Sequence, residues 1–497
     1  MKTFRFFFLV SLSLFSISCS NRIIEEPKEL LKDTGAYTKA DASSFSSVNF
    51  NFSVKEKDIW VFIERQKEFP LVVSINPIVR EGDTLLYIAN LEKGWKVFSA
   101  DKHLPPILAE IPEGSFGDKT LDNPGIRAWM DSMTDLTSDI RQEKELSSAT
   151  DFTDLWEGYP VTKKETRENN GIRGLSMEPT WTRAVIYEQT VLDTITYGPL
   201  LSTKWGQRTP WNNSLPIYQG SQHYPTGCAA VAISQILYYY HDFIDTPSGL
   251  FHDISISNWI YNSGIDPYYT SVLSRQNYQE PSSRWAQMVK DTVEYNTYYP
   301  SSITGASYVS DLMVDVGNRT SMKYYADGSK SGAQLTGELS ALSSFGLDYN
   351  YSTFNINTAY TELANSRPIL INGVDSSNNA GHAWVIDGAK KSQYITYITY
   401  QWWMGYLAGS LPNGEEMTQS QAQEAAWEIG LDKPADGMIT YGVSYTEPYY
   451  QFYMNWGWDG SSDGLYFYNG LVLHNNQYYH FSDNQYIIYN FHAHTGN

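Results

Sequence analysis

The stretch that decides the fold is Tyr224–Leu237, YPTGCAAVAISQIL, which places a cysteine directly after a Pro-Thr-Gly turn and at the start of an apolar run. The run predicts a buried helix that extends to about Tyr240. The chain of 497 residues holds one other cysteine, Cys19, close to its N-terminus. We therefore expect Cys228 to be the single thiol of the folded body, either a buried structural residue or a nucleophile.

A nucleophilic role for Cys228 requires activation, because the thiolate reacts and an ordinary thiol has a pKa of about 8.5. The N-terminus of a helix favours a negative group by roughly 0.3–1 kcal/mol. Gly227 permits a sharp backbone turn and leaves space for a substrate. The helix alone fits both interpretations, so the choice depends on partner residues elsewhere.

His382 is the candidate base among the nine histidines of the chain. It begins an apolar strand predicted over residues 381–388, GHAWVIDG, and lies 154 residues after Cys228. The alternative is a histidine that caps the core. His223 is nearer in sequence, which does not indicate contact, and the pair His492 and His494 lacks the further ligands of a metal site. The sequence therefore predicts neither a metal nor a cofactor.

Asn455 and Trp456 follow a predicted strand and enter the glycine-rich turn NWGWDG. An asparagine amide can accept a hydrogen bond from one ring nitrogen of His382 and direct the other toward sulfur. The tryptophan would shield that bond from water. A turn asparagine beside a packing tryptophan is the alternative.

Gln207 lies 21 residues before Cys228, in the segment WGQ. Its side-chain NH₂ can donate to an oxyanion together with the backbone N–H of Cys228. One such donor lowers a barrier by about 3 kcal/mol. Taken alone, Gln207 is better explained as an ordinary loop residue.

The four motifs, in the order Gln, Cys, His and Asn-Trp, match the papain-like arrangement and most closely resemble the streptopain family of cysteine peptidases. The resemblance is carried by KWGQ (204–207), PTGCAA (225–230), GHAWVIDG (381–388) and NWGW (455–458), and in the front half by GWKVFSAD (94–101) and PILA (106–109), which are similar to that family's inhibitory pro-domain. It implies an α+β fold, in which a papain-like catalytic domain with a helical part and an antiparallel β part follows an α+β pro-domain. It also implies an endopeptidase that acts on proteins or peptides and is inhibited by its own pro-domain. Cys228 and His382 would form the catalytic pair, Gln207 would serve the oxyanion, and Asn455 and Trp456 would orient the histidine.

The expected organisation has five parts. They are a signal peptide (1–18), a lipidated tether (19–42), an inhibitory pro-domain (43–158), a linker with the maturation site (159–180) and the peptidase domain (181–497). The linker is expected where residues 161–174 are charged and lack a hydrophobic period, a composition that proteases cut readily. In the front half, a hairpin is predicted from residues 84–90 and 95–99, and an amphipathic helix begins at residues 123–125.

The N-terminus is typical of an export signal, with Lys2 and Arg5 before an apolar run that is too short to span a bilayer. It ends in Ser-Ile-Ser-Cys19, which resembles a bacterial lipobox, although Ser16 stands where leucine is usual. We expect cleavage before Cys19, acylation of that residue and membrane attachment through the acyl chains alone. The expected location is the bacterial cell envelope, with release of the catalytic domain after maturation. An ordinary secretory signal is the alternative.

Composition narrows the classes of function. The formal net charge of −20 argues against a nucleic-acid partner, because phosphate binding requires a basic surface. Aromatic residues make up 15% of the chain, which also suits a non-catalytic surface lipoprotein that binds ligands on an aromatic platform. A peptidase that cuts only its own linker is a further alternative.

Overall fold

The computed structural model describes residues 52–66, 69–117, 119–142, 152–157, 180–241, 256–263, 267–274, 281–326, 331–375, 380–405, 439–445, 448–468, 473–474, 477–478 and 485–493. The predicted signal peptide, the tether with Cys19, and residues 159–179 of the predicted linker lie outside these residues. We call the described residues 52–157 the front domain and those from 180 onward the main domain.

Helices occur in both domains. In chain order they are α1 (Glu56–Arg65), α2 (Pro124–Gln142), α3 (Thr153–Glu157), α4 (Cys228–Tyr240), α5 (Pro281–Gln287), α6 (Thr292–Thr297), α7 (Ser302–Arg319), α8 (Leu335–Ser344) and α9 (Ile356–Ala364), with a short 3-10 turn at Thr120–Asp122. Within the described residues, every helix is too short or too polar to cross a membrane.

The strands of the front domain are β1 (Val72–Arg80), β2 (Asp83–Leu91), β3 (Trp95–Ser99) and β4 (Ile107–Ile111). Those of the main domain are β5 (Thr180–Tyr197), β6 (Ile217–Gln219), β7 (Gln222–His223), β8 (Ile256–Asn262), β9 (Tyr268–Ser274), β10 (Leu347–Thr353), β11 (Ile369–Asp375), β12 (Ala380–Gly405), β13 (Ile439–Tyr445), β14 (Tyr449–Asn455), β15 (Gly464–Phe467), β16 (Leu473–His474), β17 (Gln477–Tyr478) and β18 (Tyr486–Ala493). The predicted hairpin is confirmed as β2 and β3, and the predicted helices are confirmed as α2 and α4.

One antiparallel sheet runs through both domains. Its strand order is β1-β2-β3-β4-β15-β14-β12-β11-β18-β10, and β5 and β13 also pair with β12. The domains join where β4 pairs with β15, with Ala109 opposite Tyr466 and Glu110 opposite Leu465. The front domain is therefore attached to the main domain by backbone hydrogen bonds as well as by side chains.

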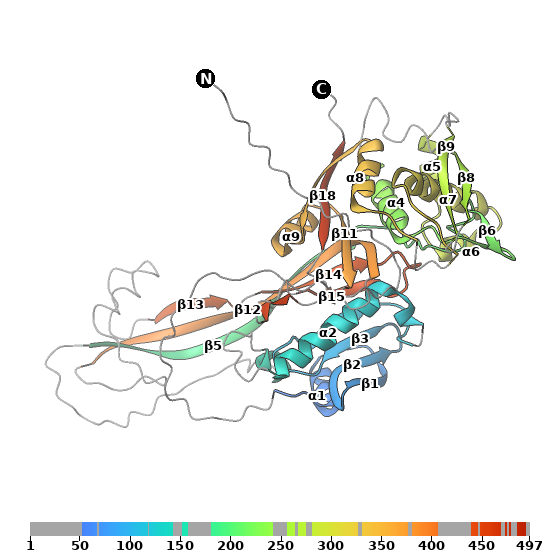
Figure 1. Ribbon diagram of the computed structural model, residues 1–497. Helices are drawn as coiled ribbons and strands as arrows, with labels where there is room; N and C mark the ends of the chain where they lie inside the picture. Colours follow the sequence, from blue (N-terminus) through green and yellow to red (C-terminus); the bar gives the residue numbers. More distant parts are fainter. Residues whose placement is uncertain are drawn as a thin grey trace, which may run out of the picture.

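Helix α2 lies between the front-domain strands and the strands β14 and β15 (Figure 1). Its buried residues Ile126, Trp129 and Leu136 belong to a core that also contains Trp456 and Tyr466 of the main domain. The Trp129 indole N–H donates to the carbonyl of Phe467 at 3.3 Å. Helix α2 therefore contributes to the core on both sides of the domain boundary.

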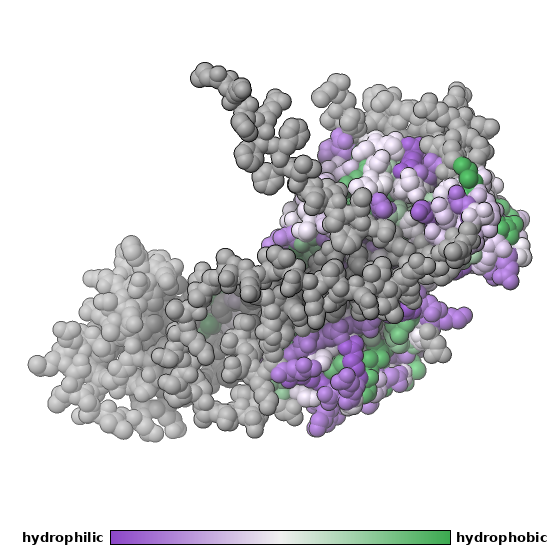
Figure 2. Space-filling view, viewed as in Figure 1, coloured by the Kyte–Doolittle hydropathy of each residue, from purple (hydrophilic) through white to green (hydrophobic). Residues whose placement is uncertain are grey.

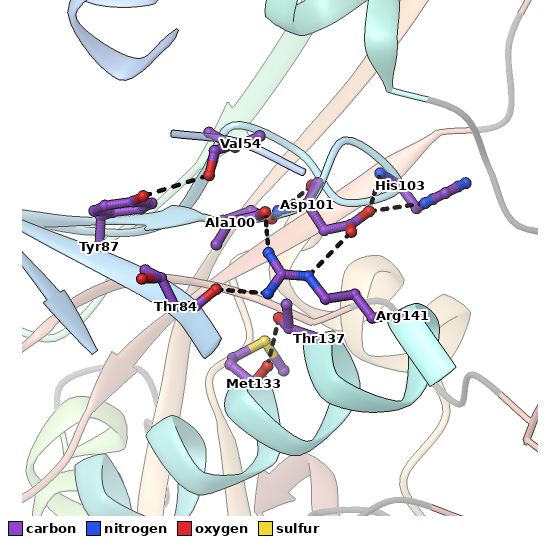
Figure 3. Close-up of polar contacts among 10 residues, drawn as sticks. Val54, Thr84, Tyr87, Ala100, Asp101, His103, Met133, Thr137 and Arg141 are labelled. Atoms are coloured by element: carbon purple, nitrogen blue, oxygen red, sulfur yellow. Dashed lines mark hydrogen bonds and ion pairs between the residues drawn. The ribbon is translucent and has the colours of Figure 1, made fainter. Parts of the chain in front are cut away.

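The far end of α2 is fixed to the front-domain sheet by Arg141 (Figure 3). Its guanidinium donates to the carbonyl of Thr84 at 2.7 Å, to Asp101 Oδ2 at 3.4 Å and to the carbonyl of Ala100. The other oxygen of Asp101 accepts from the backbone N–H of His103 at 3.0 Å. Because hydrogen bonds to charged groups are among the stronger ones, this cluster orients the whole helix.

The helical part of the main domain forms around α4. All its residues from Cys228 to Leu237 are buried, in a core shared with α7, α8 and the strands β11 and β12. On the opposite side of the molecule, β5, β12 and β13 of the main domain project outward as a long ribbon (Figure 1). Hydrophilic residues predominate on the coloured part of the front domain in Figure 2, with hydrophobic residues between them. The observed layout is α+β, as predicted.

Candidate active site

Cys228 is the first residue of α4 and is 1% exposed. The turn before it depends on Gly227, whose φ of +87° lies in the left-handed region that favours glycine. A Cβ at this position would also lie 2.5 Å from the sulfur of Met322. The predicted helix start and turn are therefore confirmed, and they place the thiol beside the unpaired N–H groups of a helix terminus.

The segment that carries Gln207 lies against this turn. The N–H of Thr226 donates to the carbonyl of Gln207 at 3.0 Å, two residues before the cysteine. The segment is fixed further by Trp205, whose indole N–H donates to the carbonyl of Val289 at 2.8 Å. The structure thus bonds the backbone of Gln207 to the turn that precedes Cys228.

His382 lies on β12, opposite Gly373 of β11, and is 3% exposed. Its ring packs beside those of Trp384 and Trp456, with centroid distances of 5.8 and 6.2 Å. Its Nε2 donates to the backbone carbonyl of Trp456 at 3.0 Å. Its Nδ1 has no hydrogen-bond partner among the described residues.

The side chain of Asn455 bonds to groups other than the predicted partner His382. Its Oδ1 accepts from the side chain of Gln235 at 3.1 Å and from the N–H of Gly457 at 3.3 Å. Its Nδ2 donates to the carbonyl of Thr203 at 2.8 Å. The orienting bond comes from the next residue, Trp456, through its main chain, because β14 ends at Asn455 and the following carbonyl faces the imidazole.

The front domain reaches this site through the first turn of α2. A Cβ on Gly125 would lie 2.3 Å from the ring of Trp456 and 3.1 Å from Cδ2 of His382. The residue before the helix, Asn123, is 4% exposed and accepts from the N–H of Gly125 at 2.9 Å. Helix α2 therefore touches the histidine and its orienting residue directly.

Glu338 of α8 lies in the core behind the nucleophile. Its Oε2 accepts from Nδ2 of Asn372 at 2.7 Å, and its Oε1 has no hydrogen-bond partner among the described residues. Burial raises the pKa of this carboxyl to about 8, the Asn372 amide opposes the rise, and the nearby charge of Cys228 adds to it. A carboxyl that stays neutral up to this pH places no negative charge beside Cys228.

Three aspartates accept hydrogen bonds around the Trp456 turn, of which Asp387 and Asp463 are buried and Asp459 is exposed. Asp463 Oδ1 accepts from the N–H of Trp456 at 2.9 Å, Asp459 accepts from the indole of Trp211, and Asp387 Oδ2 accepts from the N–H of Leu201 at 3.0 Å. Burial raises the pKa of Asp387 to about 8 and that of Asp463 to about 7, although the backbone N–H bonds oppose both shifts. The charge of Asp463 raises the pKa of Asp387 further.

The remaining histidine candidates lie apart from these groups. His223 donates from Nδ1 to the carbonyl of Leu215, and His492 does so to the carbonyl of Asn490 at 2.8 Å. His494 lies outside the described residues. Across the described part of the chain, no group of three or more His, Cys, Asp or Glu side chains is arranged to hold a metal ion.

Gln235 and Asp463 contribute hydrogen bonds to the site but belong to none of the predicted sequence motifs. The signal for Gln235 was present, because a polar residue interrupts an otherwise apolar buried helix seven positions after Cys228. Asp463 and Glu338 carry no such signal, since each is a single acidic residue in an unremarkable segment. Their proximity to the site depends on tertiary packing.

The site combines a cysteine at a helix N-terminus, an imidazole held by a backbone carbonyl and a glutamine segment bonded to the turn before the cysteine. On an α+β scaffold, this combination fits the class of papain-like cysteine peptidases. The model of the peptidase C10 family matches residues 205–466, which is just over half of the chain. The chain therefore belongs to the peptidase C10 family and is a cysteine-type peptidase. Membership of a peptidase family argues against the alternative that the chain is a non-catalytic binding protein.

Related proteins include streptopain from Streptococcus pyogenes, 23% identical over 344 residues that cover 64% of this chain and 71% of streptopain. Among solved structures, a prointerpain A fragment from Prevotella intermedia is 19% identical, with a TM-score of 0.47 over 84% of this chain and 97% of that chain. The active wild-type interpain A cysteine protease of the same organism is 23% identical, with a TM-score of 0.36 over 59% of this chain and 94% of that chain.

The raised pKa of Asp387 predicts that stability falls with rising pH. A carboxyl that binds its proton more tightly in the folded chain stabilises the fold fully below its ordinary pKa of 3.8, and this contribution is lost as the pH rises through about 8. Asp387→Asn keeps an oxygen for the N–H of Leu201 and cannot ionise. Its free energy of unfolding, from urea titrations at pH 4, 6 and 8, should decline less with pH than that of the wild type.

The exposed Asp83 provides the control, because Asp83→Asn removes a surface charge and should retain the wild-type pH dependence. Equal pH dependence in the Asp387→Asn variant and the wild type would contradict the assignment of a protonated Asp387.

Proposed function

We propose that the chain is the zymogen of an endopeptidase that uses Cys228 and His382 as a thiolate–imidazolium pair. The observation that carries the proposal is the hydrogen bond from Nε2 of His382 to the carbonyl of Trp456, at 3.0 Å. It assigns the ring proton to Nε2 and leaves Nδ1 to exchange a proton with the thiol. An imidazole fixed through one nitrogen is the arrangement that general acid–base catalysis needs.

In the proposed reaction, the thiolate of Cys228 attacks the peptide carbonyl carbon and the π electrons move to the oxygen. The side-chain amide of Gln207 and the N–H of Cys228 stabilise that oxyanion. His382 then protonates the departing amine from Nδ1, the C–N bond breaks and an acyl-enzyme remains. Water, deprotonated by His382, hydrolyses the thioester and restores the thiolate.

Substitution of Cys228 tests this assignment. Cys228→Ala should lower hydrolysis of an unrelated protein such as casein by at least about 10³-fold after processing of the chain with an added protease, because the covalent step is lost. Cys228→Ser should be nearly as inactive, since a hydroxyl is far less ionised than a thiol. Hydrolysis of casein by the wild type would also exclude the alternative of a peptidase that cuts only its own linker. Near-wild-type hydrolysis by the alanine variant would contradict the proposal.

The front domain is proposed to be the inhibitory pro-domain. Support comes from the contact of Gly125 with the rings of Trp456 and His382, which places α2 where His382 meets its orienting residue. At the same junction, Lys390 of β12 pairs with Glu110 of β4 at 2.9 Å. Cleavage within residues 159–180 would then let the front domain leave the site.

The Glu110 ion pair explains why mild acid alone would not separate the domains. Burial alone would raise the pKa of Glu110, but the ammonium groups of Lys96 and Lys390 outweigh it and lower the pKa to about 2. A depressed carboxyl pKa contributes stability that is complete above the ordinary value of 4.5 and is lost only as the pH falls toward 2. Proteolysis of the linker is therefore the proposed trigger.

Gly125→Ala tests the inhibitory contact. The added methyl group cannot fit 2.3 Å from the Trp456 ring, so α2 must shift away from His382. The uncleaved variant should hydrolyse a peptide substrate faster than the uncleaved wild type or mature sooner when both are followed by gel and activity. Gly117→Ala is the matched control, since a Cβ there meets no atom within 4 Å. Indistinguishable behaviour of the two variants would argue against the contact.

We also propose that the chain is exported and acylated at Cys19. Incorporation of a labelled fatty acid should be seen in the wild type and lost in Cys19→Ser, with the uncleaved protein shifting from the membrane to the soluble fraction. After maturation and dissociation of the front domain, the main domain should become soluble. A secreted protein that incorporates no fatty acid would instead favour an ordinary signal peptide.

A further inference from the structure

Gln235 is the one strongly polar side chain on a buried face of helix α4. This face contacts the loop that carries Gln207 and the strand that ends at Asn455. Gln235 lies seven residues after Cys228, which is two helical turns, and is therefore on nearly the same side of the helix. Its side chain is 0% exposed. Burial of an amide is costly unless its hydrogen bonds are made, so its partners indicate what it does.

The amide of Gln235 joins segments that each hold one part of the site. Its Oε1 accepts from Oγ1 of Thr203 at 3.1 Å and from the N–H of Trp205 at 3.4 Å. Its Nε2 donates to Oδ1 of Asn455 at 3.1 Å. Asn455 closes the cycle by donating to the carbonyl of Thr203 at 2.8 Å.

Each hydrogen-bond partner of Gln235 is linked to a proposed catalytic group by a short stretch of chain and one further hydrogen bond. Thr203 and Trp205 begin the loop that carries Gln207, whose carbonyl accepts from Thr226 in the turn before Cys228. Asn455 precedes Trp456, whose carbonyl accepts the Nε2 proton of His382. The helix of the nucleophile, the oxyanion loop and the support of the histidine are thus connected through two side-chain amides.

We propose that Gln235 is a positioning residue which, through Asn455, sets the Gln207 loop and the Trp456 carbonyl relative to Cys228. This inference rests on the proposed roles of Cys228 and His382. The cycle gives Asn455 a function other than a bond to the imidazole, and it accounts for both its amide groups. A displacement of about 1 Å at a catalytic group can lower a rate about 10²-fold, so the connection should affect turnover more than substrate binding.

Gln235→Glu provides the main test, because the side chain keeps its shape and its acceptor but loses the N–H that Asn455 accepts. The full-length chain is processed with an added protease and its active sites are titrated with an irreversible papain-type inhibitor. Per titrated site, kcat for a peptide substrate should fall about 10- to 100-fold while KM stays near the wild-type value.

Two further variants test whether the loss of kcat is a general structural effect. Ser234→Ala changes the adjacent position of the same helix. It removes a buried hydroxyl that has no hydrogen-bond partner among the described residues, so kcat should be unchanged. Thr203→Val removes only the bond to Oε1 of Gln235 and should lower kcat by a smaller factor with KM unchanged. It also serves as the decisive variant if Gln235→Glu does not fold.

Wild-type kcat per titrated site in Gln235→Glu would overturn the positioning role, as would an equal loss of kcat in Ser234→Ala. If Gln235→Glu does not fold, wild-type kcat in Thr203→Val has the same consequence. None of these results would affect the proposed peptidase function, which depends on whether the processed Cys228→Ala protein is inactive.

Discussion

The contact between the first turn of α2 and the imidazole of His382 is the constraint on which the proposed inhibition depends. Gly125 has no side chain, and this allows the helix to approach the ring of Trp456 more closely than any Cβ would permit. The same ring packs beside His382, and the carbonyl of Trp456 accepts its Nε2 proton. A single helix terminus thus lies against both the histidine and the residue that orients it.

The continuous sheet explains how this contact is maintained. The strand pair β4–β15 and the shared core under α2 join the domains by backbone and by apolar packing, so the front domain is more than a loosely bound cover. Arg141 fixes one end of α2 to its own sheet while Gly125 fixes the other on the site. Removal of the front domain must therefore break strand pairing as well as side-chain contacts, which favours proteolysis over a change of pH.

The sequence predicted the parts of the fold and site that follow from local pattern. The helix after Gly227, the hairpin of β2 and β3, helix α2 and the α+β class all depend on periodicity and turn residues. The order of Gln207, Cys228 and His382 suggested a site, and in the structure the carbonyl of Gln207 bonds to the turn before Cys228. The ring of His382 bonds to the carbonyl of Trp456 and not to the side chain of Asn455, a distinction that a motif does not specify. The buried partners Gln235, Glu338 and Asp463 depend on tertiary packing that no single-sequence pattern encodes.

The central proposal is that the front domain, through the contact of α2 with His382, keeps the Cys228–His382 pair inactive until the linker is cleaved. The most direct measurement is the rate of Cys228 alkylation by iodoacetamide at pH 6, compared between the intact chain, the processed chain and processed His382→Ala. The account predicts that the processed wild type reacts at least about tenfold faster than the intact chain, because only a paired thiol is ionised at this pH, and that His382→Ala loses this acceleration. Equal rates for the intact and processed chains, or an acceleration that persists without the imidazole, would contradict it.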